Sequence, residues 1–366
     1  MRPASEEELS EMVRTAKGPM VVRGGGTRAI GRPVAGEVLE TAGLSGISLY
    51  EPGALTLVVQ AGTPLAEVEA ALAKEGQRLP FEPMDMRALL GRDGEPTVGG
   101  MVAANASGPR RVQTGACRDS LIGLRFVDGS GAIVKNGGRV MKNVTGYDLV
   151  KLMAGSWGTL GVLSECSFKL LPVPAAEVTL VSAEVSPAEA VRLMSQALGT
   201  PYEVNGAARG ADGRVALRIE GFAEQVSYRG AALRAALGGD WEVLESDASA
   251  ELWRDIRNVR GFARAAGDVW RLSVRPSEAP DLVARADCPV VMDWGGGLIW
   301  ALVAERRDLR ASLGAFKGHA TLIRGSEATR AAVPVFQPEA APVAALAQGL
   351  RARFDPRGVL NPGLMG

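Results

Sequence analysis

Residues 95–108 are Glu95-Pro96-Thr97-Val98-Gly99-Gly100, four further residues, and then Asn105-Ala106-Ser107-Gly108. The run Gly158-Thr159-Leu160-Gly161-Val162 stands further along the chain. Glycine accounts for 46 of the 366 residues, well above its usual share of about 7%, and the glycines concentrate before residue 165. Because glycine lets a ligand approach the backbone closely, we predict a ligand site within the first 165 residues.

Another glycine-rich loop lies earlier in the chain, where Arg23-Gly24-Gly25-Gly26-Thr27-Arg28 follows the short apolar strand expected at residues 20–22. It is called the first glycine-rich loop below, and residues 95–108 are called the second glycine-rich stretch. Three consecutive glycines can turn their backbone N–H groups towards one anion. Thr27 adds a hydroxyl group, and the two arginines add positive charge. The loop therefore favours a phosphate or pyrophosphate, although a glycine turn with no ligand is the alternative for this loop taken alone.

Two common nucleotide folds fit this loop poorly. Gly24-x-Gly26-x-x-Ala29 formally matches the dinucleotide fingerprint of the Rossmann fold, which requires a helix directly after the glycines. Residues 31–43 contain three glycines and one proline, and such residues interrupt a helix. A phosphate-binding Walker A loop is excluded because no Gly-Lys-Ser/Thr follows. The loop is interpreted as an anion-binding turn after a strand.

Composition excludes several classes of function. Lys plus Arg and Asp plus Glu both number 41, and a chain without excess positive charge is a poor candidate for nucleic acid. Residues 1–16 lack a signal peptide pattern, and no apolar run approaches the ~20 residues of a transmembrane helix. The three cysteines form no disulfide framework or Cys-x-x-Cys cluster. We therefore predict a cytoplasmic protein. Because the chain has one histidine, we also predict no metal site and no catalytic residue of its own.

Local signals predict several elements. Ser5-Glu6-Glu7-Glu8 is a capping box for a helix that ends near Lys17, and Thr63-Pro64 predicts an N-cap for a helix that ends at Gly76. A hairpin is expected over residues 121–134, with its turn at Asp128-Gly129-Ser130-Gly131. The run Leu171-Pro172-Val173-Pro174 interrupts regular structure. We therefore expect domains at residues 1–174 and 175–335, with a C-terminal segment at 336–366.

The order and spacing of the glycine-rich segments, together with Asn143-Val144-Thr145-Gly146-Tyr147-Asp148, resemble the FAD-binding domain of the vanillyl-alcohol oxidase / p-cresol methylhydroxylase (PCMH) flavoproteins. The resemblance covers residues 1–174. It implies an α+β fold in which a two-subdomain PCMH-type FAD-binding domain precedes a smaller α+β cap domain, expected to hold an antiparallel sheet. It also implies that the last residues return to the FAD domain, with Asn361-Pro362-Gly363 near the flavin.

The same resemblance implies the cofactor contacts. The first loop would bind the FAD pyrophosphate through main-chain amides, and the second glycine-rich stretch would lie against the flavin ring. Gly115 and Asp119 would approach the pyrophosphate and ribitol, and residues 158–162 would line the adenine side. FAD is expected to bind non-covalently, because residues 1–174 contain no histidine. The residues expected to bind FAD are Arg23, Gly24, Gly25, Gly26, Thr27, Arg28, Pro96, Thr97, Val98, Gly99, Gly100, Asn105, Ser107, Gly108, Gly115, Asp119, Gly158, Gly161 and Val162.

Segments after residue 250 narrow the family. Four segments are similar to the FAD-binding E subunit of bacterial glycolate oxidase. They are Leu252-Trp253-Arg254-Asp255-Ile256-Arg257, Met292-Asp293-Trp294-Gly295-Gly296, residues 319–325 and residues 354–363. The resemblance implies one subunit of a complex that oxidises glycolate, a 2-hydroxy acid, to a 2-oxo acid.

The resemblance also implies partners: a catalytic FAD-containing subunit and an iron–sulfur subunit, which could hold the chain peripherally at the inner membrane. FAD would be an electron relay or a structural cofactor, and the isolated chain is expected to be inactive on glycolate. The alternatives are a self-sufficient FAD-dependent D-2-hydroxy acid dehydrogenase and a non-catalytic assembly subunit. A peptidoglycan-precursor reductase of the same fold is disfavoured by the segments after residue 250.

The single histidine and the tryptophans of the second half each have a functional and a structural interpretation. His319 could remove the hydroxyl proton of a 2-hydroxy acid, but a turn histidine after Gly318 is the favoured interpretation. The tryptophans of the second half are interpreted as core or subunit contacts rather than a substrate cage: Trp253, Trp270, Trp294 and Trp300.

Overall fold

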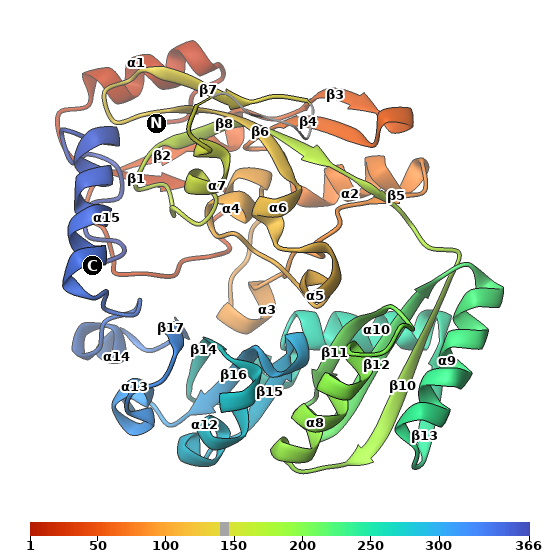
Figure 1. The fold of residues 1–366 in the computed structure, drawn as a ribbon. Coiled ribbons are helices and arrows are strands. Elements are labelled where there is room, and N and C mark those ends of the chain that lie inside the picture. Colours follow the sequence, from red (N-terminus) through yellow and green to blue (C-terminus); the bar gives the residue numbers. More distant parts are fainter. Residues whose placement is uncertain (140–145) are drawn as a thin grey trace.

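The computed structural model describes residues 1–139 and 146–366, so the Asn143-Val144-Thr145 part of one motif lies outside the described residues. The chain forms two lobes (Figure 1). The N-terminal lobe, residues 1–172, contains β1 to β9, and the C-terminal lobe, residues 176–335, contains β10 to β17. Helices and antiparallel sheets occur in both lobes, which confirms the predicted α+β class.

A five-stranded antiparallel sheet organises the N-terminal lobe, in the order β3-β4-β8-β6-β7. β4 and β8 lie more than a hundred residues apart in the sequence yet pair from Thr56 opposite Lys169 to Gln60 opposite Glu165. The predicted hairpin of β6 and β7 is confirmed, with Asp128 accepting hydrogen bonds in its turn. The strands of this lobe are β1 (Met20–Arg23), β2 (Glu37–Glu40), β3 (Ile47–Glu51), β4 (Thr56–Gln60), β5 (Gln77–Arg78), β6 (Leu121–Val127), β7 (Ile133–Gly137), β8 (Val162–Lys169) and β9 (Leu171–Pro172).

Side-chain caps begin only some of the helices described in this lobe. The Ser5 hydroxyl accepts a hydrogen bond from the Glu8 amide at 3.1 Å, and the helix ends at Thr15. The predicted Thr63 cap is wrong: its hydroxyl donates to the Gln60 carbonyl at 2.8 Å, and Pro64 is the N-cap. The helices are α1 (Glu6–Thr15), α2 (Leu65–Lys74), α3 (Arg87–Leu90), α4 (Val98–Ala103), α5 (Arg111–Thr114), α6 (Cys117–Ser120) and α7 (Leu149–Met153), with short 3-10 turns at Thr41–Gly43 and Pro52–Ala54.

An eight-stranded antiparallel sheet forms the C-terminal lobe, in the order β13-β10-β12-β11-β15-β16-β14-β17. Its strands are β10 (Ala176–Glu184), β11 (Val204–Arg209), β12 (Arg214–Gly221), β13 (Trp241–Glu245), β14 (Asp268–Val274), β15 (Val290–Asp293), β16 (Leu298–Val303) and β17 (Gly318–Arg324). The helices and 3-10 turns around it are α8 (Pro187–Leu198), α9 (Ala223–Leu237), α10 (Ser246–Arg257), α11 (Arg260–Ala263), α12 (Ala279–Ala286), α13 (Leu309–Leu313), α14 (Glu327–Ala332), Pro276–Glu278 and Trp294–Gly296.

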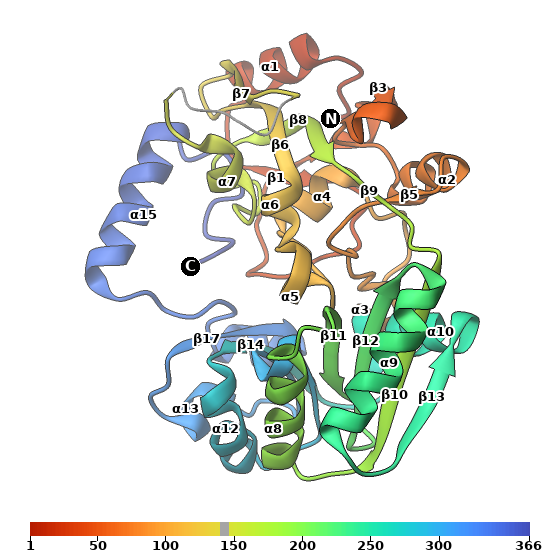
Figure 2. The ribbon, with the colours of Figure 1, turned by 45° about the vertical axis from the view of Figure 1, so that its right-hand side comes forward.

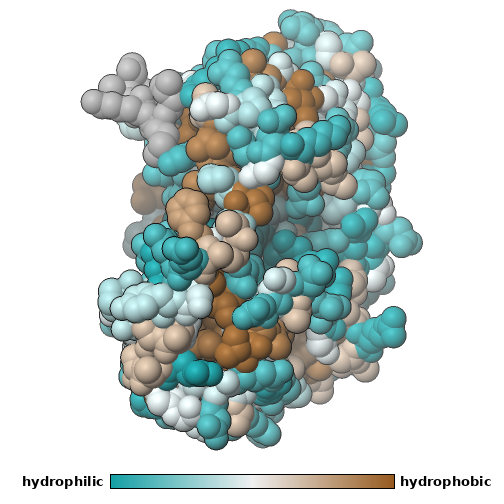
Figure 3. All heavy atoms as spheres, turned by 90° about the vertical axis from the view of Figure 1, so that its right-hand side faces the viewer, coloured by the Kyte–Doolittle hydropathy of each residue, from teal (hydrophilic) through white to brown (hydrophobic). Residues whose placement is uncertain are grey.

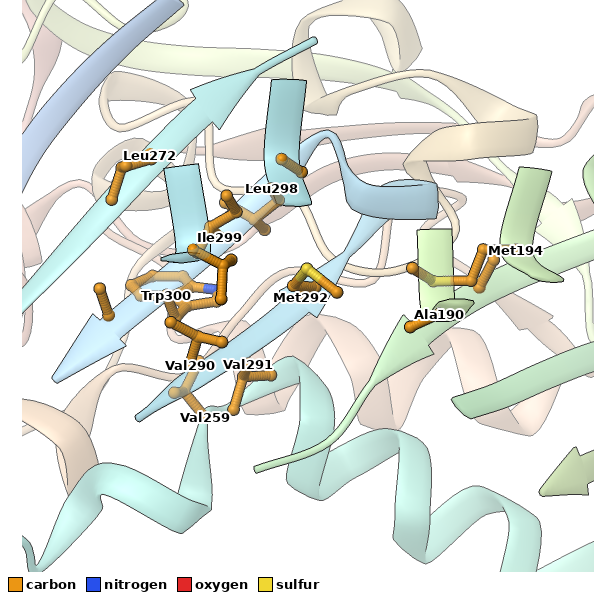
Figure 4. Packing of buried hydrophobic residues seen from close by; sticks show 14 of the residues in the cluster. Ala190, Met194, Val259, Leu272, Val290, Val291, Met292, Leu298, Ile299 and Trp300 are labelled. Carbon is orange, nitrogen blue, oxygen red and sulfur yellow. The ribbon is translucent and has the colours of Figure 1, made fainter. Parts of the chain in front are cut away.

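Alternating side chains bury both faces of this sheet. Ala207 of β11 and Leu217 of β12 belong to the main core, together with residues of α8 and α9. Their neighbours Ala208 and Ala216 point the other way, into a small cluster with Trp253 of α10. Figure 4 shows the main core from close by, with Ala190 and Met194 of α8 beside Met292 of β15 and Trp300 of β16 further along the sheet.

A buried charged cluster fastens the two lobes together. Arg218 of β12 has 2% of its side chain exposed and donates to both carboxylate oxygens of Glu82, at 2.9 and 2.8 Å. Glu220, also of β12, accepts from Arg78 at 2.7 Å and pairs with Arg110. Burial by itself would raise the pKa of Glu82, but the hydrogen bonds and positive charges of Arg218 and Arg110 lower it below its ordinary value.

The C-terminal residues return to the N-terminal lobe. α15 (Ala341–Phe354) runs along its side (Figures 1 and 2). The Phe354 ring lies 6.0 Å from that of Phe126 in β6, and the Phe354 carbonyl accepts from Gly129 at 2.8 Å. Leu360 then forms a parallel bridge with Met20 of β1. The last residues are thereby held beside the first glycine-rich loop.

The molecular surface seen in Figure 3 is mostly hydrophilic, with hydrophobic residues in small patches. Within residues 1–139 and 146–366, no helix combines the length and apolar character needed to cross a membrane.

Candidate cofactor site

The first glycine-rich loop connects two parallel strands. β1 and β2 pair from Met20 opposite Glu37 to Arg23 opposite Glu40, and residues 24–36 between them contain no helix. A Rossmann site needs the positive end of a helix at this position. The structure therefore confirms that the loop is not a Rossmann fingerprint.

A cavity of about 440 Å³ lies against this loop, within the ~300–1,000 Å³ typical of ligand pockets. Both glycine-rich stretches line it, together with residues that no local motif marked. The predicted FAD-binding residues that line it are Arg23, Gly24, Gly25, Gly26, Thr27, Arg28, Thr97, Gly99, Gly100, Gly158 and Gly161.

The charge of the lining is one-sided. The lining residues include no Asp, Glu or Lys. They include five arginines: Arg23, Arg28, Arg32, Arg92 and Arg330. Arg28 donates to the Met84 carbonyl at 2.8 Å. Burial lowers the pKa of Arg28 to about 10 although the charge of Asp85 opposes this, so the guanidinium stays protonated at neutral pH. Such a lining suits an anion with more than one charge, such as a pyrophosphate.

The two glycine-rich stretches pack directly against each other. A Cβ atom at Gly24 would lie within 3.0 Å of the Thr97 hydroxyl oxygen, and one at Gly25 would overlap the Glu95 carbonyl. Sequence reasoning attributed these glycines to the approach of a ligand. The structure adds a different reason, because the missing Cβ atoms leave room for the backbone of residues 95–97.

Thr97 lines the cavity at the start of a helix. Its hydroxyl oxygen accepts a hydrogen bond from the Gly100 amide at 3.3 Å, which caps α4. The Gly99 amide donates to the Ala61 carbonyl at 2.6 Å, which ties the start of this helix to the end of β4. The second stretch is thus held rigidly at the cavity wall.

The C-terminal segment completes the cavity. The Asn361 carboxamide oxygen accepts from the Val22 amide at 2.8 Å, and its NH₂ group donates to the Trp157 carbonyl at 2.9 Å. Asn361 therefore connects β1 to the turn that carries Gly158. Its left-handed backbone, with φ of 44°, suits asparagine better than most residues.

Other predicted residues hold the turn at residues 105–119 and do not line the cavity. Asn105 accepts from the Arg118 amide at 3.1 Å, Ser107 from the Cys117 amide at 3.0 Å, and Asp119 from the Ala116 amide at 2.8 Å. Their polar atoms stabilise the loop that follows the second stretch. The other predicted residues outside the lining are Pro96, Val98, Gly108, Gly115 and Val162, and their contact with FAD stays a prediction.

Sequence reasoning missed lining residues that come from distant segments. Arg330 of α14 reaches from the C-terminal lobe and donates to the Ala29 carbonyl at 3.1 Å, and Leu364 lies beside Gly31. No local pattern marks them. Also missed were Arg32, Thr41, Arg92, Ala103, Trp157 and Leu163.

The thiols of the N-terminal lobe are remote from this chemistry. Cys117 and Cys166 are buried and absent from the lining. Burial raises the pKa of both thiols well above the ordinary value, which makes them poor nucleophiles. In the described part of the chain, no group of three or more His, Cys, Asp or Glu residues could hold a metal ion.

Comparison with known proteins defines the class. Residues 1–137 match the FAD-binding-domain family. The solved structure of alkyldihydroxyacetonephosphate synthase superposes with a TM-score of 0.70 and 16% identity, covering 99% of this chain and 75% of that one. The chain therefore carries an FAD-binding domain, and its fold is the PCMH-type flavoprotein fold that the sequence predicted.

The comparison with curated proteins gives the family. The chain is 37% identical over 365 residues to the glycolate oxidase subunit GlcE of Escherichia coli K12, covering 98% of this chain and 97% of that protein. It belongs to the GlcE family of FAD-dependent oxidoreductase subunits. It is also 33% identical over 186 residues to the glycolate oxidase subunit GlcD of Bacillus subtilis, but covers only 38% of that protein.

Proposed function

We propose that this chain is the FAD-binding subunit of a multi-subunit glycolate oxidase, with FAD held non-covalently in the arginine-lined cavity. The observation that carries the proposal is this cavity, in a chain collinear with a glycolate oxidase subunit over 98% of its length. Residues 24–28 lie at the cavity together with Thr97, Gly99 and Gly100. Its arginines supply the positive charge that a pyrophosphate needs, although Arg23 is also paired with Glu40.

Individual residues have distinct roles in holding FAD. The positive charges of Arg28 and Arg330 would neutralise the pyrophosphate. Both side chains are held in place by hydrogen bonds to backbone carbonyls, at 2.8 and 3.1 Å. Thr27 has a buried hydroxyl at the loop. Asn361 would close the cavity from the C-terminal side. When bound, the flavin supplies a group that accepts and donates electrons.

The nature of the lining supports non-covalent binding. Flavins attach to proteins through nucleophilic side chains, and the residues that line the cavity include no Cys, His or Tyr. The buried thiols Cys117 and Cys166 lie elsewhere and stay protonated at neutral pH. FAD would therefore be retained by hydrogen bonds and charge alone.

We further propose that the chain works with a catalytic FAD-containing subunit and an iron–sulfur subunit, peripherally at the inner membrane. The described part of the chain holds no metal-binding cluster, so electrons leaving this lobe would pass to a partner. His319 is the one histidine in the sequence, and a site that uses several histidines cannot form. FAD is then an electron relay or a structural cofactor.

An anaerobic mixing experiment tests this function. The FAD-loaded chain is mixed with excess glycolate or D-lactate, and the visible flavin absorption is followed. We expect no bleaching by the isolated chain, and bleaching once the catalytic subunit is added if FAD is an electron relay. An unchanged spectrum even then would indicate a structural cofactor. Rapid bleaching of the isolated chain would instead support a self-sufficient D-2-hydroxy acid dehydrogenase.

A pull-down from the native cell extract tests the partners. The tagged chain is expected to recover a second flavoprotein together with iron, scored by flavin and metal content. Recovery of partners by a chain that carries no FAD would favour the non-catalytic assembly subunit. Recovery of FAD with no partner in any condition would contradict the multi-subunit proposal.

A further inference from the structure

Two arginines from different lobes lie against one tryptophan. The guanidinium carbon of Arg111 in α5 is 4.4 Å from the centre of the Trp294 ring, and that of Arg271 in β14 is 5.2 Å from it. Arg271 also lies 6.0 Å from the ring of Trp300. Trp294 was interpreted from the sequence as a core or subunit contact, but it is only partly buried and forms an aromatic surface shared by two cations.

Trp294 is fixed in place between the lobes. Its indole N–H donates to the Gly108 carbonyl at 3.0 Å, and its backbone amide donates to Asp293 at 2.7 Å. Its backbone has φ of 55°, a left-handed conformation that costs a bulky residue energy. The hydrogen bond to Gly108 ties this surface to the end of the second glycine-rich stretch. The position of the ring is therefore determined by both lobes.

The charges of the two arginines are not balanced within the described part of the chain. Neither side chain has a hydrogen bond or ion pair to a described carboxylate, whereas the buried Arg218 is paired with Glu82. Burial lowers the pKa of Arg271 to about 10, and the charge of Arg111 acts in the same direction. For Arg111, burial and the charge of Arg118 lower the pKa, and Asp119 opposes them.

Like charges held together at the edge of a protein interior are unfavourable unless something compensates them. Contact with an aromatic face compensates each cation in part. Full compensation needs an anion, and buried charges in proteins are normally paired. Because Arg111 and Arg271 approach the same ring from two lobes, an anion between them could accept hydrogen bonds from both guanidinium groups.

His319 adds a neutral polar group to the same region. It is the second residue of β17 and lies opposite Ser273 of β14, so the expected turn position is wrong. The His319 side chain is exposed, and desolvation by the surrounding protein followed by the charges of Arg271 and Arg111 lowers the pKa of His319 below its ordinary value. The imidazole is therefore neutral at pH 7, and it can exchange hydrogen bonds with a hydroxyl group without adding a third positive charge.

We propose that Arg111 and Arg271 bind the carboxylate of a small 2-hydroxy acid at the face of Trp294. The chemical class rests on the proposed function, while the anion site rests on the two arginines. None of the residues involved lines the FAD cavity, so the proposed carboxylate site uses different residues from the proposed FAD site. The ligand is expected to be small because two cations share one aromatic ring, which suits a single carboxylate with a neighbouring hydroxyl.

The test is a calorimetric titration of the FAD-loaded chain with glycolate, with D-lactate, and with glycolamide, which has a similar shape and no charge. Binding of the two acids and no binding of glycolamide are expected. Each of Arg271→Met and Arg111→Met should weaken glycolate binding roughly 10- to 100-fold, because each removes a charge-assisted hydrogen bond. The control Arg254→Met changes an exposed arginine of α10 and should leave the affinity unchanged.

A melting experiment without ligand separates binding from a structural role. Arg271→Met relieves the repulsion between two cations, so the variant should melt at or above the wild-type temperature. A lower melting temperature together with unchanged glycolate affinity would overturn the proposal, as would equal binding of glycolamide and glycolate.

Flavin content, measured on every sample, distinguishes the two proposals. A wild-type chain that carries FAD but binds neither acid refutes the carboxylate site and leaves the FAD proposal intact. A chain that binds glycolate through Arg271 but no FAD refutes the FAD proposal instead.

Discussion

The contact between Gly24 and Thr97 predicts a specific coupling between two substitutions. A methyl group at Gly24 would lie within 3.0 Å of the Thr97 hydroxyl oxygen. The backbone of Gly24 is not in the left-handed region, so Gly24→Ala introduces no backbone strain of its own. Its cost should come from this one contact, and forced overlap of this kind typically costs ~1–3 kcal/mol.

Removing the hydroxyl group should relieve the overlap. Thr97→Ala by itself loses the cap on the Gly100 amide, which should cost ~0.5–2 kcal/mol. Without the hydroxyl, the nearest Thr97 atom to the new methyl group is Cβ at 3.4 Å, an ordinary contact. The double variant should therefore be about as stable as Thr97→Ala, which gives a coupling energy of ~1–3 kcal/mol.

The assay compares four proteins by urea unfolding of the N-terminal lobe and by titration of the apoprotein with FAD. Gly24→Ala should weaken FAD binding more than Thr97→Ala, and the double variant should recover most of the difference. Gly53→Ala is the matched control, because a Cβ there meets nothing within 4 Å and should change stability by less than ~0.5 kcal/mol. Additive costs of the two substitutions, within ~0.5 kcal/mol, would refute the reasoning.

Three further outcomes are expected. Acid precipitation of the FAD-loaded chain should leave all flavin in the supernatant, since Cys117 and Cys166 lie outside the cavity; a yellow washed pellet contradicts non-covalent binding. Burial raises the pKa of Asp293 from 3.8 to about 7, so the folded state holds a proton that the unfolded state releases. The free energy of unfolding should therefore fall by roughly 2–4 kcal/mol as pH rises from about 4 to 7. The urea midpoint, measured against pH, should show this fall in the wild-type chain and a smaller fall in Asp293→Asn. Glu82→Ala should cost ~3–5 kcal/mol because the buried Arg218 would lose the carboxylate that both of its terminal nitrogens contact, and the double variant with Arg218→Met should recover part of it; a loss below ~1 kcal/mol for Glu82→Ala would contradict this.

Local elements were largely predictable from the sequence. The cap at Ser5, the hairpin turn at Asp128 and the two glycine-rich stretches depend on residues within a few positions of one another, so their patterns are visible in a short window. The Thr63 cap failed for a tertiary reason. Its hydroxyl also accepts a hydrogen bond from the Gly46 amide at 2.9 Å, a partner seventeen residues away.

The sequence by itself determined the class of fold, the glycine-rich loops and the family, because these depend on residue types in a fixed order along the chain. Only the tertiary structure decided which residues surround the cavity and which hold nearby turns, since Arg330 and Leu364 reach it from segments far from the glycines. It also decided that Arg111 and Arg271 share the ring of Trp294. Charge balance depends on distances in space, and those distances follow from how the two lobes pack against each other.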